Sequence, residues 1–456
     1  MDPKWIELAY VLAAVLFIFA LKAMSSPRTA RRGNLLGALG MLVAIVFTLL
    51  SRQVVSWPWI IAGLVLGSAI GGYLAMRVQM TGMPQMVAVF NGMGGLASGL
   101  VVLVFAFTEH FTFYRALTVG ASTLIGWVTL TGSLVAFAKL QGFVLSGRPV
   151  LFRMQKLANL GLLLGSVGLI TLWTLFPAWW LLVIPLLLLA CALGVGFTIP
   201  IGGGDMPVVI SLLNSYSGLA ACATGFVLDN SGLIIAGALV GASGIILTRI
   251  MCVAMNRSLA NVLFGGVGVI VAPAGGGDEH KPVTSWTPQD AAICLENSSH
   301  VVIVPGYGMA VAQAQHALRD LGDLLEKSGI SVRYGIHEVA GRMPGHMNVL
   351  LAEADVPYEQ LLDRQSVNPE FDHTDAVLVI GANDVVNPAA RSDKTSPIYG
   401  MPILDVDKAA TVMVCKRTLN PGFAGIDNEL FYQDNTAMIF GDAKKTVTEI
   451  IAALKE

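Results

Sequence analysis

Long apolar stretches dominate the first 260 residues, and short polar segments separate them. A helix that crosses about 30 Å of hydrocarbon needs roughly 20 apolar residues. The sequence therefore predicts a membrane α-helical bundle of about nine transmembrane helices, at residues 5–24, 34–51, 57–76, 83–108, 116–138, 157–176, 178–199, 207–228 and 232–252.

The pattern changes after residue 260. Residues 261–287 are rich in Gly, Pro and charge, which is typical of a linker. From 288 to 456, short β-branched runs alternate with helical stretches, and this alternation predicts a C-terminal α/β Rossmann-like domain with a parallel sheet. We expect strands at 300–305, 331–336, 375–380, 411–415 and 436–440, and helices at about 309–328, 346–355 and 443–454.

Composition supports this division. The 456 residues are 55% hydrophobic and only 13% charged, whereas soluble domains contain about 25% charged residues. This excludes a soluble globular enzyme, a disordered chain and a nucleic-acid-binding protein. Residues 1–260 carry 14 basic and 5 acidic side chains, and residues 261–456 carry 14 and 25. The cysteines have no spacing that indicates a disulfide framework or a metal site: Cys191, Cys222, Cys252, Cys294 and Cys415.

The distribution of Lys and Arg predicts the orientation in the membrane. An N-terminus on the outside places eleven basic side chains on the cytoplasmic side and three outside, as the positive-inside rule requires. The odd number of spans then places the C-terminal domain in the cytoplasm. The three outside residues are Lys4, Arg52 and Arg115.

Glycines at four-residue spacing within the spans indicate tight helix packing. Polar residues also share faces of the fourth and eighth spans, where they form hydrogen bonds between helices or line a hydrated proton or ion path. No predicted span centre contains Asp, Glu, Lys or His. Asp205, at the cytoplasmic start of the eighth span, is either a helix-start residue or a group that relays protons. The glycines are 63, 67, 71, 161, 165, 237 and 241; the polar faces contain Asn91, Gly95, Ser98 and Gly99, and Ser211, Asn214, Ser215 and Gly218.

Glycines, an acid and a basic pair follow the predicted strands, and ligands of parallel sheets bind at the carboxyl ends of strands. The turn Gly306-Tyr307-Gly308 precedes a helix, so a pyrophosphate could bind amides at that helix start. Lys416 and Arg417 suit a 2′-phosphate and favour NADP over NAD, unless they form a solvated basic patch. An NAD site usually has an acid about 20 residues after the glycine turn, at the end of the second strand. Glu338 is the candidate for this acid, although it lies further along the chain than is usual.

These motifs together resemble the beta subunit of proton-translocating NAD(P) transhydrogenase. The resemblance covers nearly the whole chain. It rests on Gly-Gly-Gly-Asp-Met-Pro-Val-Val (202–209), Leu-Asn-Ser-Tyr-Ser-Gly (213–218), Met-Asn-Arg-Ser (255–258), Pro-Gly-Tyr-Gly-Met-Ala-Val-Ala-Gln-Ala-Gln (305–315), the run Val-Ala-Gly-Arg-Met-Pro-Gly-His-Met-Asn that opens segment 339–354, Val-Ile-Gly-Ala-Asn-Asp (379–384) and Gly-Asp-Ala-Lys (441–444).

The resemblance implies a Re/Si-specific oxidoreductase that transfers hydride between NAD(H) and NADP(H) and couples this to proton translocation across the cell inner (plasma) membrane. NADP(H) would bind this chain and NAD(H) a partner alpha subunit. The resemblance also allows a separate small membrane subunit and a dimer of heteromers in the lipid bilayer. Asp384 would lie near the nicotinamide and sense protonation, Lys416 and Arg417 would hold the 2′-phosphate, and Asn91, Asp205 and Asn214 would belong to the proton path.

The NADP(H) contacts that the resemblance implies come from five segments of the C-terminal domain. They are Gly306, Tyr307, Gly308, Ala310 and Val311; Val339, Ala340, Gly341, Arg342, Met343 and Pro344; Gly381, Ala382, Asn383, Asp384 and Val385, with Gly400 and Met401; Lys416, Arg417, Thr418, Leu419, Asn420, Pro421, Gly422 and Phe423; and Asp442 and Ala443.

The sequence departs from the family pattern in three ways. Many relatives have His at the position of Asn91, so we hypothesise that a partner membrane subunit supplies the titrating group. Phe423 replaces a tyrosine, which removes a hydroxyl and keeps a ring. Asp405 and Asp407 add acid whose effect the sequence does not explain.

The alternative function is an ion channel or transporter whose cytoplasmic domain senses nucleotides and catalyses no reaction. Composition fits both functions, because each combines membrane spans with a Rossmann-like domain. The basic pair and the uncharged span centres favour the transhydrogenase. Copurification with an NAD-binding partner would discriminate between them.

Overall fold

The computed structural model describes residues 3–50, 56–108, 112–143, 150–256, 258–264 and 282–456. These residues form two compact units, Met1–Thr248 and Arg249–Glu456. Most of the predicted linker, together with Arg52, Arg148 and Arg257, lies outside the described residues.

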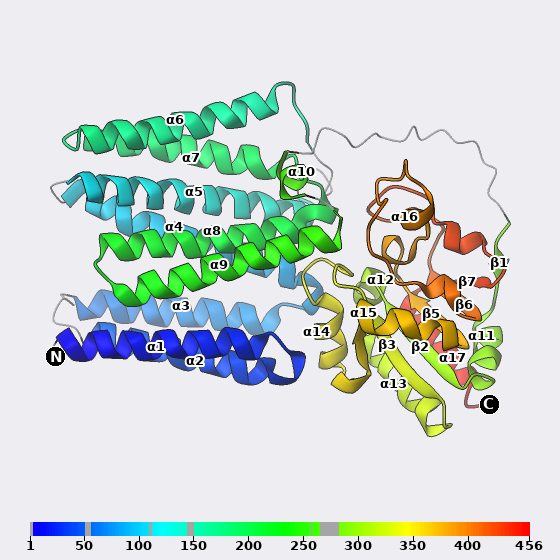
Figure 1. Ribbon diagram of the computed structural model, residues 1–456. Coiled ribbons are helices and arrows are strands. Elements are labelled where there is room, and N and C mark those ends of the chain that lie inside the picture. Colours follow the sequence, from blue (N-terminus) through cyan, green and yellow to red (C-terminus); the bar gives the residue numbers. More distant parts are fainter. Residues whose placement is uncertain (1–2, 51–55, 109–111, 144–149, 257, 265–281) are drawn as a thin grey trace. The chain divides into compact units, whose positions relative to one another are not determined.

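The first unit is a bundle of long helices that run alongside one another (Figure 1). Within the described residues, nine helices are long and apolar enough to cross a membrane, which confirms the predicted spans. They are α1 (Pro3–Met24), α2 (Pro27–Leu49), α3 (Trp57–Arg77), α4 (Met83–Thr108), α5 (Phe113–Gln141), α6 (Gln155–Leu175), α7 (Val183–Thr198), α8 (Met206–Val227) and α9 (Ser231–Ala254). The span that contains α7 begins with the short helical turn Trp180–Leu182.

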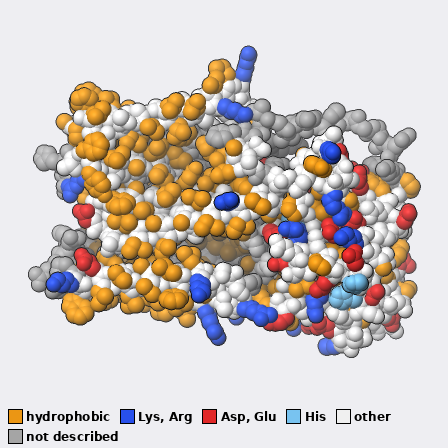
Figure 2. All heavy atoms as spheres, in the orientation of Figure 1, with side chains coloured by type: hydrophobic (Ala, Val, Ile, Leu, Met, Phe, Trp, Pro, Cys, Tyr) orange, Lys and Arg blue, Asp and Glu red, His pale blue; other side chains and the backbone are white. Residues whose placement is uncertain are grey.

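Figure 2 shows hydrophobic side chains over most of the visible face of this bundle, whereas charged side chains gather over the second unit. A contiguous apolar surface of this size is costly in water and favourable in lipid. The helical unit is therefore a membrane domain.

Glycines allow close helix contact at two interfaces of the bundle. A Cβ on Gly95 of α4 would lie 2.6 Å from the carbonyl oxygen of Gly126 on α5, and one on Gly218 of α8 would lie 2.5 Å from the amide of Gly241 on α9. Gly237 and Gly241 therefore pack as predicted. The prediction is wrong for α3 within this chain, because no described atom lies within 4 Å of a Cβ built on its glycines.

The second unit contains a seven-stranded parallel sheet in the order β1-β7-β6-β5-β2-β3-β4. The chain order reverses between β2 and β5, which makes the carboxyl ends of these two strands the topological switch point. The strands are β1 (Thr284–Ser285), β2 (His300–Pro305), β3 (Ser331–Ile336), β4 (Leu361–Asp363), β5 (Ala376–Ile380), β6 (Thr411–Lys416) and β7 (Thr436–Phe440).

Five strands match their predicted positions, and β1 and β4 are additional edge strands. The helix predicted at 309–328 is two helices, because Gln313 adopts a left-handed conformation with φ 50° and breaks the helical path. The helices are α10 (Leu259–Phe264), α11 (Pro288–Glu296), α12 (Tyr307–Ala312), α13 (Gln315–Lys327), α14 (His346–Glu353), α15 (Arg364–Val367), α16 (Ala389–Ser392) and α17 (Ala443–Ala453).

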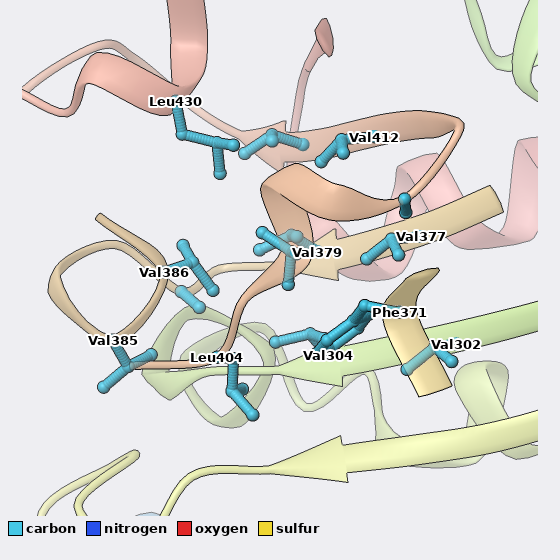
Figure 3. Packing of buried hydrophobic residues seen from close by; sticks show 14 of the residues in the cluster. Val302, Val304, Phe371, Val377, Val379, Val385, Val386, Leu404, Val412 and Leu430 are labelled. Atoms are coloured by element: carbon cyan, nitrogen blue, oxygen red, sulfur yellow. The ribbon is translucent and has the colours of Figure 1, made fainter. Parts of the chain in front are cut away.

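Side chains from both faces of the central strands are buried, as a parallel sheet requires. On one face, Val302, Val304 and Val379 pack against Phe371 and Leu404 (Figure 3). Short helical turns cover this face, including Asn368–His373, Val406–Lys408 and Glu429–Tyr432. This core holds the strand ends, and the loops that follow them, in fixed positions.

Candidate functional site

Two glycine turns touch each other at the switch point. The amides of Gly306 and Gly308 donate to the carbonyls of Ile380 (2.8 Å) and Gly381 (2.9 Å). A Cβ on Gly308 would lie 2.6 Å from the Cα of Gly381, which itself has a φ of +66°. Because these two amides already donate within the protein, the phosphate contact predicted for this turn would use other amides of the helix start.

The loop after β3 folds around a buried histidine. The amide of Arg342 donates to His346 Nδ1 (3.0 Å), and a Cβ on Gly341 would lie 2.6 Å from the same atom. The guanidinium of Arg342 lies 4.5 Å from the centre of the Tyr307 ring, which also approaches the Phe423 ring at 6.4 Å. The loops after β2, β3 and β6 therefore meet, and the Phe423 ring retains an aromatic contact.

A second buried histidine, His337, joins the loop after β3 to a more distant segment. Its Nε2 donates to the carbonyl of Pro402 (2.7 Å), and its Nδ1 accepts from the amide of Val339 (3.2 Å). Burial lowers the pKa of His337, in accordance with this neutral form. The neighbouring Glu338 pairs with Arg364 at 3.3 Å. The carboxylate predicted as a late candidate for an NAD ribose therefore already has a basic partner.

Asp384, at the carboxyl end of β5, contacts the loop that follows β6. Its Oδ2 accepts from the amide of Ala424 (3.0 Å). A Cβ on Gly422 would lie 2.6 Å from its Oδ1. The position of the Asp384 carboxylate therefore requires glycine at 422, because a side chain there would collide with it. The carboxylate in turn holds the loop after β6 against the switch point.

The predicted basic pair divides into one half-buried and one exposed side chain. Lys416 Nζ donates to the carbonyl of Asn420 (2.9 Å) and lies 4.7 Å from the centre of the Phe431 ring. With its amide oxygen turned toward the lysine, Asn383 accepts from Nζ at 3.1 Å. Burial lowers the pKa of Lys416, and Asp384 opposes this. Arg417 is exposed at the carboxyl end of β6.

The additional acids Asp405 and Asp407 both pair with Arg391 of α16. This ion pair joins the two ends of the segment that contains Gly400 and Met401. Met401 is buried in a small apolar cluster against which Ala424 packs. The acids therefore fix a segment whose Gly400 and Met401 the family resemblance places among the NADP(H) contacts.

The last predicted segment has a structural role. Asp442 caps α17 by accepting from the amides of Lys444 and Lys445, and the amide of Gly441 donates to the carbonyl of Lys416. Of the other residues predicted to contact NADP(H), some have side chains buried in the core and some have exposed side chains. The buried ones are Ala310, Ala340, Ala382, Val385 and Ala443; the exposed ones are Val311, Thr418, Asn420 and Pro421.

In the membrane unit, the predicted polar faces of α4 and α8 form hydrogen bonds between helices. Asn91 of α4 is buried and donates to the carbonyl of Ile210 on α8 (3.1 Å). Ser211 and Ser215 donate to backbone carbonyls of α9. Asn214 lies on α8 one helical turn after Ile210 and is half-buried. The structure brings Asn91 close to α8, and the two serines join α8 to α9.

At one end of the bundle, Asp205 directly precedes α8 and makes no side-chain capping hydrogen bond. Lys139, counted above with the cytoplasmic loop charges, is instead buried in the last turn of α5 and is 3% exposed. Its Nζ donates to the carbonyls of Ile199 and Ile201 (2.8 Å to the latter), which precede the run Gly202–Asp205.

The sequence predicts no functional or structural role for three residues of this arrangement: Lys139, His337 and His346. A basic residue at a span end is normally a loop charge, and a single histidine in a loop has no sequence signature. His346 lies inside a quoted motif, directly after a Pro-Gly pair, and this position was the available signal.

Residues 6–453 match the family model of the NAD(P) transhydrogenase beta subunit. The chain belongs to this family. It is 50% identical over 457 residues to the NAD(P) transhydrogenase subunit beta of Rhodospirillum rubrum, and the alignment covers 98% of both chains. The same-named protein of a particular strain of that species matches equally.

Membership in the transhydrogenase beta subunit family gives the chain its general role. It is a membrane-embedded subunit of an oxidoreductase that uses nicotinamide nucleotides, and it acts with an alpha subunit.

Proposed function

We propose that residues 288–456 bind NADP(H) at the carboxyl edge of the sheet, that 261–287 form a linker, and that 1–260 form most of a proton path. The observation that carries this proposal is the meeting of the loops after β2, β3, β5 and β6 around the switch point. Arg342 lies in the loop after β3, and Lys416 is the last residue of β6. Among the described residues, neither of them makes an ion pair, so both charges suit an anionic ligand.

The choice of NADP(H) over NAD(H) rests on charge. A 2′-phosphate requires a cation, whereas an unmodified ribose is commonly held by a carboxylate. The carboxyl end of β6 supplies Lys416 and Arg417, and the carboxylate of Glu338 is engaged by Arg364. These residues fit the phosphorylated nucleotide.

The alpha subunit would hold NAD(H). Hydride transfer needs reacting atoms roughly 3–3.5 Å apart, and the two nicotinamides supply the chemistry when bound. The residues of this chain orient the nucleotide and exclude water. Asp384 would transmit the protonation state, because it contacts the loop that follows Lys416 and Arg417 at the end of β6. Such coupling is reciprocal: a proton that changes NADP(H) affinity is itself bound more or less tightly when NADP(H) binds.

In the membrane, Asn91, Asn214 and Asp205 would lie along the proton path. The protein would occupy the cell inner membrane with its N-terminus outside and its C-terminal domain in the cytoplasm. A separate small membrane subunit and a dimer of heteromers complete the proposed assembly.

The proposal is tested by measuring NADPH and NADH binding to the full chain in detergent, without the alpha subunit. The wild type should bind NADPH more tightly than NADH, and the double variant Lys416→Ala, Arg417→Ala should lose at least tenfold in NADPH affinity, about 1.4 kcal/mol. Lys445→Ala, on the exposed side of α17, is the control and should bind like the wild type. Equal affinity of the wild type for both nucleotides would contradict the proposal.

A further inference from the structure

The imidazole of His346 lies beneath the loops of the proposed nucleotide site. It is the first residue of α14, and its side chain is 0% exposed. Its Nδ1 accepts from the amide of Arg342, so the ring proton resides on Nε2. Burial, together with the Arg342 charge, lowers the pKa of His346 to about 4. The ring is therefore neutral at physiological pH.

The backbone around His346 is shaped to enclose the ring. Gly341 has a φ of +108°, and a Cβ there would overlap the imidazole. Gly345 caps α14 with a φ of +66°. Both conformations are readily available to glycine and costly for other residues. The chain thus uses two glycines to bring the Arg342 amide onto Nδ1.

The same ring is linked to the cationic part of the site. The centre of the Tyr307 ring lies 6.2 Å from the centre of the His346 ring. The guanidinium of Arg342 lies over the Tyr307 ring, 4.5 Å from its centre. Arg342 is therefore fixed at two points: its amide by the imidazole and its guanidinium by the phenol ring. Fixing a cation before binding removes an ordering cost that binding would otherwise include.

We infer that His346 is a positioning residue that orients Arg342 toward the phosphate groups of a bound nucleotide. This inference rests on the proposed NADP(H) site. His346 acts through Arg342 and does not itself contact the nucleotide. The contribution of His346 to nucleotide affinity should therefore depend on the acceptor at Nδ1 and on the presence of the Arg342 charge.

Two substitutions of similar polarity separate the acceptor from the bulk of the ring. In His346→Asn the amide oxygen can stand near the position of Nδ1 and accept from Arg342, whereas in His346→Gln the longer amide stands near Nε2. NADPH affinity of the full chain should fall at least tenfold in the Gln variant and stay within about threefold of the wild type in the Asn variant, where tenfold corresponds to about 1.4 kcal/mol. His316→Ala, exposed on α13, is the control and should have no effect.

A double-mutant cycle tests the route through Arg342. His346→Gln added to Arg342→Ala should cause no further loss of NADPH affinity. In the assembled enzyme, His346→Gln should raise the KM for NADPH and leave the KM for NADH unchanged, which a general loss of structure would not do.

Three results would overturn the inference: a Gln variant that binds like the wild type, an Asn variant as weak as Gln, or additive effects of the two substitutions. A wild-type chain that does not bind NADPH would instead refute the proposed function itself, so the two failures are distinguishable.

Discussion

Gly381 combines two constraints that glycine meets at little cost. Its φ is +66°, and its Cα lies against the backbone of Gly308, where a Cβ on the latter would come within 2.6 Å. A left-handed conformation alone costs a side-chain-bearing residue roughly 1–2 kcal/mol. Backbone atoms on the opposite turn cannot move aside as a flexible side chain can. The contact between the two turns therefore determines the shape of the switch point.

Gly381→Ala should destabilise the α/β unit more than a change of backbone conformation alone explains. The matched control is Gly329→Ala, which has a φ of +85° and no atom within 4 Å of its Cβ position. We expect a loss of about 1 kcal/mol for the control and a further 1–3 kcal/mol for Gly381→Ala from overpacking. Hydrogen exchange of the strand amides in the full chain measures both. Equal protection in the two variants would show that the turns can separate.

At the scale of elements, the end of α7 depends on a side chain from α5. The last carbonyls of a helix have no partner within that helix, and the negative end of its dipole attracts cations. The buried ammonium of Lys139 meets both needs, since it donates to the carbonyl of Ile199, the C-terminal cap of α7, and to that of Ile201. The segment that leads to Asp205 and α8 is thereby held in place.

Lys139→Met should lower the free energy of unfolding of the chain in lipid nanodiscs. The expected loss is roughly 1–3 kcal/mol for each buried carbonyl left without a donor. Lys139→Arg retains a donor and should lose less. Lys156→Met, which removes an exposed charge in the first turn of α6, is the control. Thermal unfolding followed by tryptophan fluorescence would decide the matter, and a Met variant as stable as the control would show that Lys139 does not hold this end of the bundle.

Elements with a strong repeated pattern could be predicted from the sequence, and those fixed by tertiary contact could not. The nine spans and the five central strands have long apolar or β-branched runs. The edge strands β1 and β4 contain two and three residues, too few for a periodic signal. The break at Gln313 depends on a single dihedral angle.

The same distinction holds for the candidate site. The glycine turns and the basic pair follow predicted strands, so the sequence places them at one edge of the sheet. Sequence does not show that Asp442 caps a helix or that Glu338 pairs with Arg364. Nor does it reveal the positions of His337 and His346, because these depend on loops that fold back from distant points of the chain.

At the scale of the whole molecule, the question is where a proton is carried across the membrane unit. Among the buried side chains of the described membrane unit, Lys139 is the one that carries a charge at neutral pH, and it lies at a helix end. Asn91 donates its amide to a backbone carbonyl, and an amide does not titrate at physiological pH. A path through Asn91 of α4 and the polar residues of α8 can therefore guide water, and we propose that the group that carries the proton across the span centre comes from elsewhere.

We accordingly expect a titratable side chain in the membrane spans of the partner subunit to be essential for pumping. In the complex reconstituted into liposomes, replacement of each intramembrane His, Asp or Glu of the partner by a neutral residue should identify one variant that loses proton pumping. That variant should still bind NADPH and transfer hydride when an uncoupler is present, because the nucleotide sites are unchanged. Asn91→Ala should slow pumping without abolishing it, since the amide only shapes the path. Normal pumping by a complex whose partner spans contain no titratable residue would place the carrier in this chain, and Lys139 would then be the first side chain to replace.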